Sequence, residues 1–558
     1  MRLTKNFDIY GHKSNLSFLC KDGRDYFKKQ RKLSLFLKIP WVDVHLKIHI
    51  NKYNLFHLED MVNHYLWFLD SKTNRIDVIK NRGFLGHIKD NLLKDYQGYV
   101  KSLNLQLEPK RITIIFEDKD LQDILKLIQR KIKKNSWRDL LYKLYLVKER
   151  ANNLNDELRV LGIILEKTLI GPIDIVLDLI HVCNTNCVHC WIHSPASRKN
   201  LTPNFKNQVL DLLKFKNIVD EANELGVIGI TLLGDGEPLL HPHYLDMLRY
   251  IKIKNIHTQV ISFTNGLEVK PAISEKLVKY GLNDLYCSLP AGTPETYARV
   301  CPMTGEKGFL KIKENLKYLK YVKEKKKINK LAKKKIPQVT LVFVLHRLNF
   351  HEIIDMAEFA GEVGADRIRF QIIHLDKDNW HLKLEPEHLN FLRNNHDEIE
   401  NIARKYDMTY HSSLKFQLSN INEKKGNWSE NVYVKKGCYI GWNFSIIKAN
   451  GELGLCCAVK VIDNINRDGY KNIWNSTKYQ SYRIGAKYLR ENTDMIFEKS
   501  NYHKEEGSNK MFSKKCRHCD NHDLNNYMIR LLEGCNLMEY VGTGKKDSLS
   551  TQNQSGAI

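Results

Sequence analysis

Apolar strand-like segments alternate with amphipathic helical segments from Pro172 to Ile373, and this alternation most constrains the fold. The strand-like segments span residues 173–180, 227–234, 257–264, 284–289, 339–345 and 366–373. Amphipathic segments such as 204–225 and 294–321 lie between them. Strands that are separated by helices pair in parallel through right-handed crossovers. The sequence therefore predicts an α/β fold, a partial (β/α)6 barrel that is shorter than the complete eightfold barrel.

The flanking segments predict further domains, because 558 residues exceed the length of one ordinary core. Residues 1–170 have strand-like segments at 41–50 and 111–118 and helical periodicity at 121–134, which predicts an N-terminal α+β domain for substrate or partner binding. We assign residues 171–380 to the barrel, 381–435 to a connecting helical segment and 436–540 to a small C-terminal domain. The polar residues 541–558 are expected to form a disordered tail.

Composition limits the compartment and the partners. No apolar run approaches the roughly 20 residues of a membrane span. The start, MRLTKNFDIYGHKSN, lacks the apolar region of a secretory signal, so we expect a cytoplasmic protein, in which the twelve cysteines are metal ligands or core residues. The net charge of +24 allows a nucleic acid partner. Because the lysines are spread along the chain and the densest run, 323–335, fits a solvated helix end, that partner is not favoured.

Three cysteines, Cys183, Cys187 and Cys190, directly follow the first predicted strand. Sites in parallel α/β sheets form at the carboxyl ends of the strands, so the cysteines are expected at that edge. Their C-x3-C-x2-C spacing suits three thiolates that bind three irons of a cubane cluster and leave the fourth iron open. A zinc knuckle or scattered core cysteines are the alternative interpretations.

With this spacing the chain resembles the radical S-adenosylmethionine (SAM) superfamily, in which an aromatic residue stands just before the third cysteine. His189 occupies that position. The resemblance covers residues 172–375 and implies a SAM-binding 4Fe–4S cluster, a one-electron donor such as flavodoxin or ferredoxin, and formation of a 5′-deoxyadenosyl radical from SAM.

Motifs at later strand ends also resemble SAM-binding segments of this family. GDGEP, Gly234 to Pro238, is similar to the family's Gly-Gly-Glu-Pro turn, with Asp235 where glycine is usual. Its exposed carbonyl groups and Glu237 can receive the SAM ammonium group. The resemblance implies SAM contacts from His189, Gly234, Asp235, Gly236, Glu237, Asn265, Ser288 and Gln371. Thr293 and Pro294, by contrast, indicate the start of a helix.

A second cysteine group lies beyond the predicted barrel, and its members are Cys438, Cys456, Cys516 and Cys519. Four thiolates in this arrangement suit zinc or an iron–sulfur cluster. The pattern C-x12-G-x4-C, followed by C-x2-C, is similar to the iron–sulfur extension of radical SAM enzymes called SPASM, or to its shortened twitch form. This resemblance implies an auxiliary 4Fe–4S cluster in the C-terminal domain, with those four cysteines as ligands.

One auxiliary cluster is the simplest expectation. A full two-cluster SPASM domain continues with cysteines where this chain has Asn525 and Ile529. Cys457 is an alternative to Cys456, and Cys535 is a candidate for a further ligand. The other cysteines are expected to be structural, namely Cys20, Cys287 and Cys301.

These motifs predict a radical SAM enzyme that removes a hydrogen atom from its substrate. The expected outcome is net oxidation or cross-linking of a small metabolite, such as a sugar or polyol, or of a peptide. Modification of RNA or protein is an alternative. A second alternative is a non-catalytic iron–sulfur protein, suggested by Asp235 and by Pro290, which stands where an acidic residue is usual.

Overall fold

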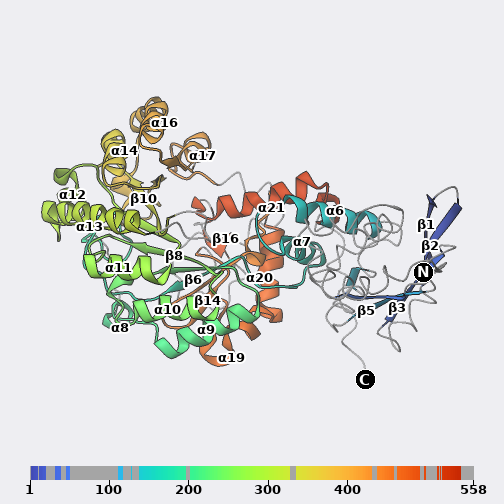
Figure 1. Cartoon of the computed structure of the whole chain (residues 1–558). Coiled ribbons are helices and arrows are strands. Elements are labelled where there is room, and N and C mark those ends of the chain that lie inside the picture. The colour runs from blue at the N-terminus through green and yellow to red at the C-terminus, as the bar shows by residue number, and fades with distance from the viewer. Residues whose placement is uncertain are drawn as a thin grey trace, which may run out of the picture. The chain divides into compact units, whose positions relative to one another are not determined.

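The computed structural model of the chain has two compact units, Met1–Leu161 with Cys535–Tyr540, and Gly162–Gly534 with Val541–Ile558. Figure 1 shows the arrangement of the elements within each unit. The structure describes residues 2–9, 12–19, 32–38, 45–50, 111–116, 127–128, 137–196, 202–326, 335–411, 413–429, 436–457, 461–489, 496–497, 512–513, 516 and 518–541. Cys20, the central part of the basic run 323–335 and the tail beyond residue 541 lie outside this part of the chain.

The first unit contains a mixed five-stranded sheet with the order β1-β2-β3-β5-β4. The strands are β1 (Arg2–Ile9), β2 (His12–Leu19), β3 (Lys32–Lys38), β4 (His45–Ile50) and β5 (Arg111–Phe116). β4 and β5 lie within the predicted strand segments 41–50 and 111–118 and pair in parallel, whereas the other neighbours are antiparallel. Apart from residues 127–128, the helix predicted at 121–134 lies outside the described residues; α6 (Trp137–Arg150) and α7 (Asp156–Leu165) follow.

A ten-stranded sheet with the order β12-β11-β10-β9-β8-β7-β6-β13-β14-β15 forms the centre of the second unit. Six of its strands confirm the six predicted ones and pair in parallel in chain order. They are β6 (Asp174–Asp178), β7 (Gly229–Leu233), β8 (Gln259–Thr264), β9 (Asp284–Ser288), β10 (Gln338–Leu345) and β11 (Arg367–Ile372). The partial barrel expected from the alternation is therefore present.

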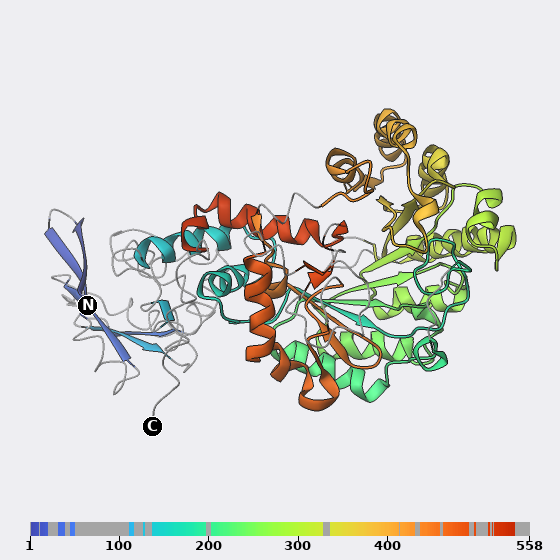
Figure 2. The same cartoon turned by 180° about the vertical axis from the view of Figure 1, so that it is seen from behind.

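Helices between these strands cover the outer face of the sheet (Figures 1 and 2). They are α8 (Pro203–Lys206), α9 (Leu212–Glu224), α10 (Tyr244–Lys254), α11 (Pro271–Tyr280), α12 (Pro294–Val300), α13 (Gly305–Lys325) and α14 (Ile353–Glu362). Their apolar faces join the strands in one core, for example through Phe215, Leu248 and Ile312. The predicted helix start is confirmed, because the Thr293 hydroxyl caps α12 by accepting a hydrogen bond from the Thr296 N–H.

The C-terminal segment, which the sequence predicts to form a small domain, extends the barrel sheet. β13 (Phe444–Ile447) pairs in parallel with β6, and β14 (Glu452–Gly454) and β15 (Asp463–Asn464) continue the sheet antiparallel. At the other edge, β12 (Thr409–Tyr410) pairs with β11. A partial barrel leaves its first strand with an unpaired edge, and β13 satisfies the backbone groups of β6.

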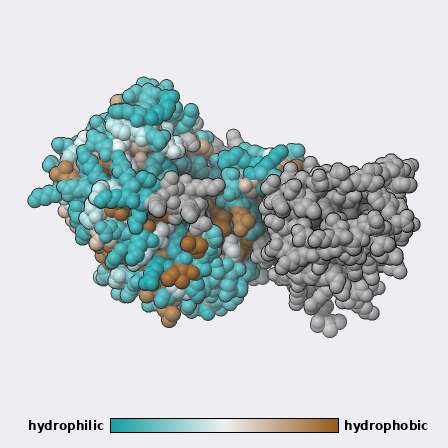
Figure 3. Space-filling view, viewed as in Figure 1, coloured by the Kyte–Doolittle hydropathy of each residue, from teal (hydrophilic) through white to brown (hydrophobic). Residues whose placement is uncertain are grey.

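The remaining α-helices and strands follow β11 in the chain. They are α15 (Pro386–Asn394), α16 (His396–Lys405), α17 (Ser413–Asn420), α19 (Ile465–Trp474), α20 (Thr477–Lys487), α21 (His522–Gly534), α22 (Met538–Val541), β16 (Ile496–Phe497) and β17 (Phe512–Ser513). The face in Figure 3 is mostly hydrophilic over the described residues, with small separate hydrophobic areas. No helix in the described part of the chain has the length and apolar character needed to cross a membrane.

Candidate functional site

The loop that follows β6 carries Cys183, Cys187 and Cys190 and is stabilised by its own backbone. The Cys190 N–H donates to the Cys187 carbonyl oxygen over 2.9 Å, and the His193 N–H donates to Cys190 Sγ over 3.3 Å. Burial raises the pKa of the Cys183 thiol to about 12 and also raises the pKa of Cys190. The thiols therefore hold protons that binding of a metal cluster would displace.

The GDGEP turn after β7 lies directly against the segment that leads into this loop. The Gly236 N–H donates to the Ile180 carbonyl oxygen over 2.9 Å, and the Glu237 N–H donates to the Val182 carbonyl oxygen over 2.8 Å. A Cβ atom at Gly236 would lie 2.1 Å from that Val182 oxygen. Glycine is required because the two backbones approach this closely, and the contact fixes the turn beside Cys183.

Glu237 joins the GDGEP turn to the TNG turn, which follows β8. Its side chain is 1% exposed and accepts hydrogen bonds from the Thr264 hydroxyl over 2.8 Å, the Asn265 N–H over 2.6 Å and the Leu239 N–H over 3.1 Å. Burial raises the pKa of Glu237 to about 7. Glu237 therefore holds the two turns together, and its predicted contact with the SAM ammonium group stays a prediction.

The TNG turn is also bonded to the cysteine loop. The Asn265 amide donates to Asn184 Oδ1 over 2.7 Å, and its own Oδ1 accepts the Leu267 N–H over 3.0 Å. Asn184 stands directly after Cys183. The cysteine loop, the GDGEP turn and the TNG turn, which follow three successive strands, thus form one hydrogen-bonded group.

The other predicted SAM contacts come from different parts of the same sheet. Ser288 is half-buried at the end of β9. The ring of His189 lies 5.4 Å from that of His346, and burial lowers the pKa of His189 to about 4, so its imidazole is neutral. The Gln371 amide donates to Asp520 Oδ1 over 2.8 Å, which places it beside the predicted ligand Cys519.

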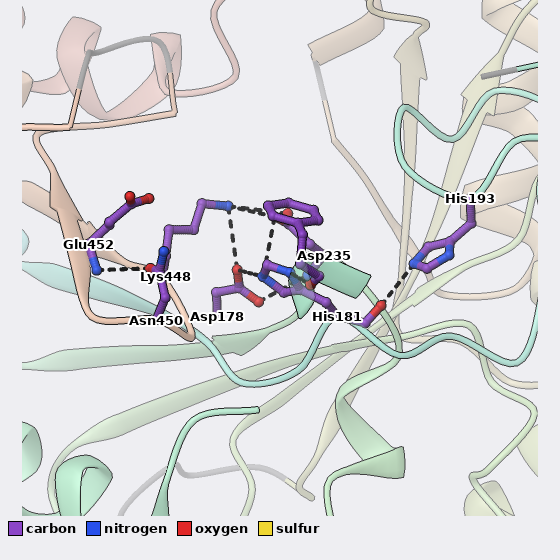
Figure 4. A network of polar contacts seen from close by, with 8 residues as sticks. Asp178, His181, His193, Asp235, Lys448, Asn450 and Glu452 are labelled. Atoms are coloured by element: carbon purple, nitrogen blue, oxygen red, sulfur yellow. Dashed lines mark hydrogen bonds and ion pairs between the residues drawn. The ribbon is translucent and has the colours of Figure 1, made fainter. Parts of the chain in front are cut away.

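Asp235, the unusual residue of the GDGEP turn, belongs to a polar network (Figure 4). Its N–H donates to Asp178 Oδ1 over 3.0 Å, and its carboxylate accepts from Lys448 Nζ over 3.1 Å. His181 lies 2.9 Å from Asp178 Oδ2 through Nε2 and 2.7 Å from the Phe205 carbonyl oxygen through Nδ1. Both partners of His181 are acceptors; burial opposes the charged form, but the hydrogen bond with Asp178 raises the pKa of His181.

The second cysteine group is brought together by the C-terminal fold. Cys456 lies close to Cys438 and Cys516. A hydrogen bond with Cys457, burial, and these two neighbouring thiols raise the pKa of Cys456. Ser429 holds the C-x2-C segment, because its hydroxyl donates to the Cys516 carbonyl oxygen over 2.9 Å and accepts the Cys519 N–H over 2.8 Å. The thiol of Cys457 is exposed, and Cys535 lies in the first unit.

Asn525 and Ile529, which replace two cysteines of a full SPASM domain, have structural positions. The buried Asn525 side chain accepts the Tyr439 N–H over 2.7 Å and donates to the Gly437 carbonyl oxygen over 3.2 Å. Asn525 therefore holds the backbone on both sides of Cys438. Ile529 is one of the buried residues of α21. The single auxiliary cluster stays a prediction.

Sequence reasoning missed two residues of this region. Cys301, expected to be structural, has its Sγ 3.4 Å from Cys187 Sγ. Lys448 had no assigned role, yet its ammonium group reaches the GDGEP turn. No sequence motif marks either residue, because each contacts a segment that is far away in the chain.

The donor sets fit the groups that the motifs imply. Soft thiolate ligands suit iron–sulfur clusters. The cysteine loop offers three thiols, which leaves one iron of a cluster open to a substrate, whereas the second cysteine group offers four. The glycine-rich turn and the TNG turn adjoin the incomplete set, where a SAM-binding segment is required.

Comparisons with known proteins agree with these domains. Residues 177–360 match the family model of the Radical SAM superfamily, and residues 438–520 match that of SPASM, an iron-sulfur cluster-binding domain. The chain is 28% identical to PqqA peptide cyclase of Ruegeria pomeroyi over 36% of this chain and 48% of that protein. It is 23% identical to PqqA peptide cyclase of Gluconobacter oxydans over 57% of this chain and 81% of that protein.

Relatives with other activities also match. The chain is 23% identical to AdoMet-dependent heme synthase of Methanosarcina barkeri over 55% of this chain and 83% of that protein. Among solved structures, SuiB of Streptococcus suis bound to the precursor peptide SuiA is 16% identical, with a TM-score of 0.43, over 68% of this chain and 85% of that one. The two matched domains imply 4Fe–4S clusters and SAM.

Proposed function

We propose that this chain, which belongs to the radical SAM superfamily and carries a SPASM domain, cleaves SAM reductively and removes a hydrogen atom from a peptide. One observation carries the proposal. The cysteine loop, the GDGEP turn and the TNG turn are hydrogen-bonded to one another at the ends of three successive strands. That arrangement suits a SAM molecule held beside an incomplete set of thiolate ligands.

The residues of this group have separate roles in the proposal. Cys183, Cys187 and Cys190 would hold a 4Fe–4S cluster, which supplies one electron from a donor such as flavodoxin or ferredoxin. Glu237 and Asn265 position the turns, and the backbone groups of the turns bind SAM. His189 is neutral and half-buried next to Cys190, so it contributes shape and apolar contact rather than charge.

The proposed reaction balances as a two-electron oxidation. SAM takes up one electron and its S–C5′ bond breaks, which yields methionine and a 5′-deoxyadenosyl radical. This radical takes a hydrogen atom from the substrate and becomes 5′-deoxyadenosine. The substrate radical then loses one electron and one proton as a new bond forms. Cys438, Cys456, Cys516 and Cys519 would hold the second cluster, whose chemistry is one-electron transfer.

A peptide substrate is preferred to a sugar or polyol because of the relatives. The two PqqA peptide cyclases are named for action on a peptide, and one of them matches over 81% of its length. A peptide binds by adding to a sheet edge or by filling a groove, and the first unit with its own five-stranded sheet is available for recognition.

Anaerobic reconstitution tests the proposal. The chain is loaded with iron and sulfide, reduced with dithionite and incubated with SAM, and 5′-deoxyadenosine is measured by mass spectrometry. We expect 5′-deoxyadenosine to form; its absence in chain that contains both clusters would contradict SAM cleavage. Short peptides encoded next to this gene are then added with deuterium at carbon. Transfer of deuterium to 5′-deoxyadenosine and loss of two hydrogens from the peptide support the substrate class, whereas transfer only from a labelled sugar contradicts it.

A further inference from the structure

The hairpin between β13 and β14 holds Lys448 in a defined place. The Lys448 N–H donates to the Glu452 carbonyl oxygen over 2.8 Å, and the Glu452 N–H donates to Asn450 Oδ1 over 3.0 Å. Gly451 closes the turn with a φ of +88°, in the left-handed region that favours glycine. The lysine side chain therefore leaves the C-terminal segment from a fixed backbone position (Figure 4).

The ammonium group of Lys448 lies among buried acidic groups of the barrel. Its Nζ is 3.2 and 3.1 Å from the two carboxylate oxygens of Asp235 and 3.5 Å from Asp178 Oδ2. The side chain of Asp178 is 0% exposed and that of Asp235 is 7% exposed. The ring of Trp191, which follows Cys190, covers the same ammonium group at 5.9 Å.

Ligand atoms of Asp178, His181 and Asp235 lie within 4.8 Å of one another, a spacing that also suits a metal ion. Lys448 Nζ pairs with both carboxylates and His181 Nε2 contacts Asp178 Oδ2, so side chains of this chain already satisfy these carboxylate oxygens. The network is therefore better described as an ion-pair lock than as a cation site.

We infer that Lys448 is a positioning residue, which holds the GDGEP turn in its SAM-binding arrangement through the Asp235 carboxylate. The inference rests on the proposed function. Asp235 stands between Gly234 and Gly236, its N–H is bonded to Asp178 and its carboxylate to Lys448, so both its backbone and its side chain are held in place. The same lysine lies on the strand extension between Cys438 and Cys456. The lock thus ties the turn proposed to bind SAM to the segment proposed to bind the auxiliary cluster.

The test compares SAM affinity of the reconstituted full chain, measured by equilibrium dialysis, among variants of the pair. Lys448→Met leaves two buried carboxylates facing each other, and we expect SAM to bind at least about tenfold more weakly at unchanged iron content. Adding Asp235→Asn to Lys448→Met removes one of the two charges and is expected to restore most of the affinity. Lys448→Arg keeps the charge and is expected to bind SAM like the wild type.

Lys471→Met is the matched control. Lys471 also joins the C-terminal segment to the barrel, by a 2.7 Å contact with Glu224, but at an exposed place away from the GDGEP turn. Its loss is expected to leave SAM affinity unchanged. A SAM-induced change in the electron paramagnetic resonance spectrum of the reduced protein gives a second readout, which Lys448→Met should diminish and the double variant should recover.

The outcomes separate this inference from the proposed function. A wild type with full iron content that fails to bind SAM overturns both. Wild-type affinity in Lys448→Met, or no recovery in the double variant, overturns the lock alone. If Lys448→Met fails to fold, the double variant is compared with Asp235→Asn alone. The two are expected to bind SAM equally well, because Lys448 acts through the Asp235 carboxylate, which both variants lack. A clear difference between those two would contradict the inference.

Discussion

The thiol of Cys301 lies 3.4 Å from Sγ of Cys187, although 114 residues separate them in the chain. Cys301 is 1% exposed at the end of α12, and the neighbouring Val300 carbonyl oxygen accepts the Val188 N–H over 2.9 Å. The end of this helix therefore lies along the cysteine loop. An S–H group in this place can donate to a ligand thiolate and stabilise its negative charge.

Replacing Cys301 by alanine should lower the midpoint potential of the first cluster without loss of its iron. A hydrogen bond to a cluster sulfur favours the reduced, more negative state, so its removal disfavours reduction. Cys301→Ser retains a donor and should keep a potential closer to that of the wild type. Redox titration followed by electron paramagnetic resonance measures both values, and an unchanged potential in Cys301→Ala would argue against the hydrogen bond.

The two cysteine groups should respond differently to mutation. Cys187→Ala is expected to abolish SAM cleavage, because a cluster with two thiolate ligands does not assemble stably. Cys516→Ala is expected to retain some formation of 5′-deoxyadenosine while losing the product, because its thiol belongs to the auxiliary set. Iron content and 5′-deoxyadenosine are measured on the same samples. Equal iron and activity in Cys187→Ala and the wild type would refute the ligand assignment.

Asn525→Ala should destabilise the segment that carries Cys438. The change leaves the buried Tyr439 N–H and Gly437 carbonyl groups without their partner, at a cost of about 1–3 kcal/mol for each group. Chemical denaturation of the iron-free chain measures the loss, and auxiliary iron should be released more readily. Asn401→Ala, at an exposed site on α16 where the amide bonds to Glu398, is the control and should stay within about 0.5 kcal/mol of the wild type.

Glu237 should make the stability of the iron-free chain depend on pH. Burial raises its pKa to about 7 in the folded chain, above the value of about 4.3 in an unfolded chain. Its contribution is thus fully present below about pH 4.3 and is lost as the pH rises through about 7. The stability of the wild type relative to Glu237→Gln should fall over this range by up to about 4 kcal/mol. Denaturation curves at several pH values check this, and a constant difference would contradict the protonation of Glu237.

Local patterns in the sequence determined much of the architecture. All six predicted barrel strands are present, with ends within two residues of the predicted ones. The cap of α12 at Thr293 was predictable as well. Strand periodicity, helix capping and cysteine spacing are set by residues close together in the chain, so one sequence is enough to show them. The cysteine spacings led to the two domains that the family models match.

Tertiary structure alone decided which distant residues complete the site. The Cys301–Cys187 contact, the Asp235–Lys448 pair and the Gln371–Asp520 hydrogen bond join positions 114, 213 and 149 residues apart. The pairing of β13 with β6 could not be predicted either, because the sequence of an edge strand does not determine which other strand will pair with it. Spacing within a loop predicts the ligands, but the contacts of Asp235 with Lys448 and of Glu237 with the TNG turn depend on burial and charge between distant segments, which exist only in the folded chain.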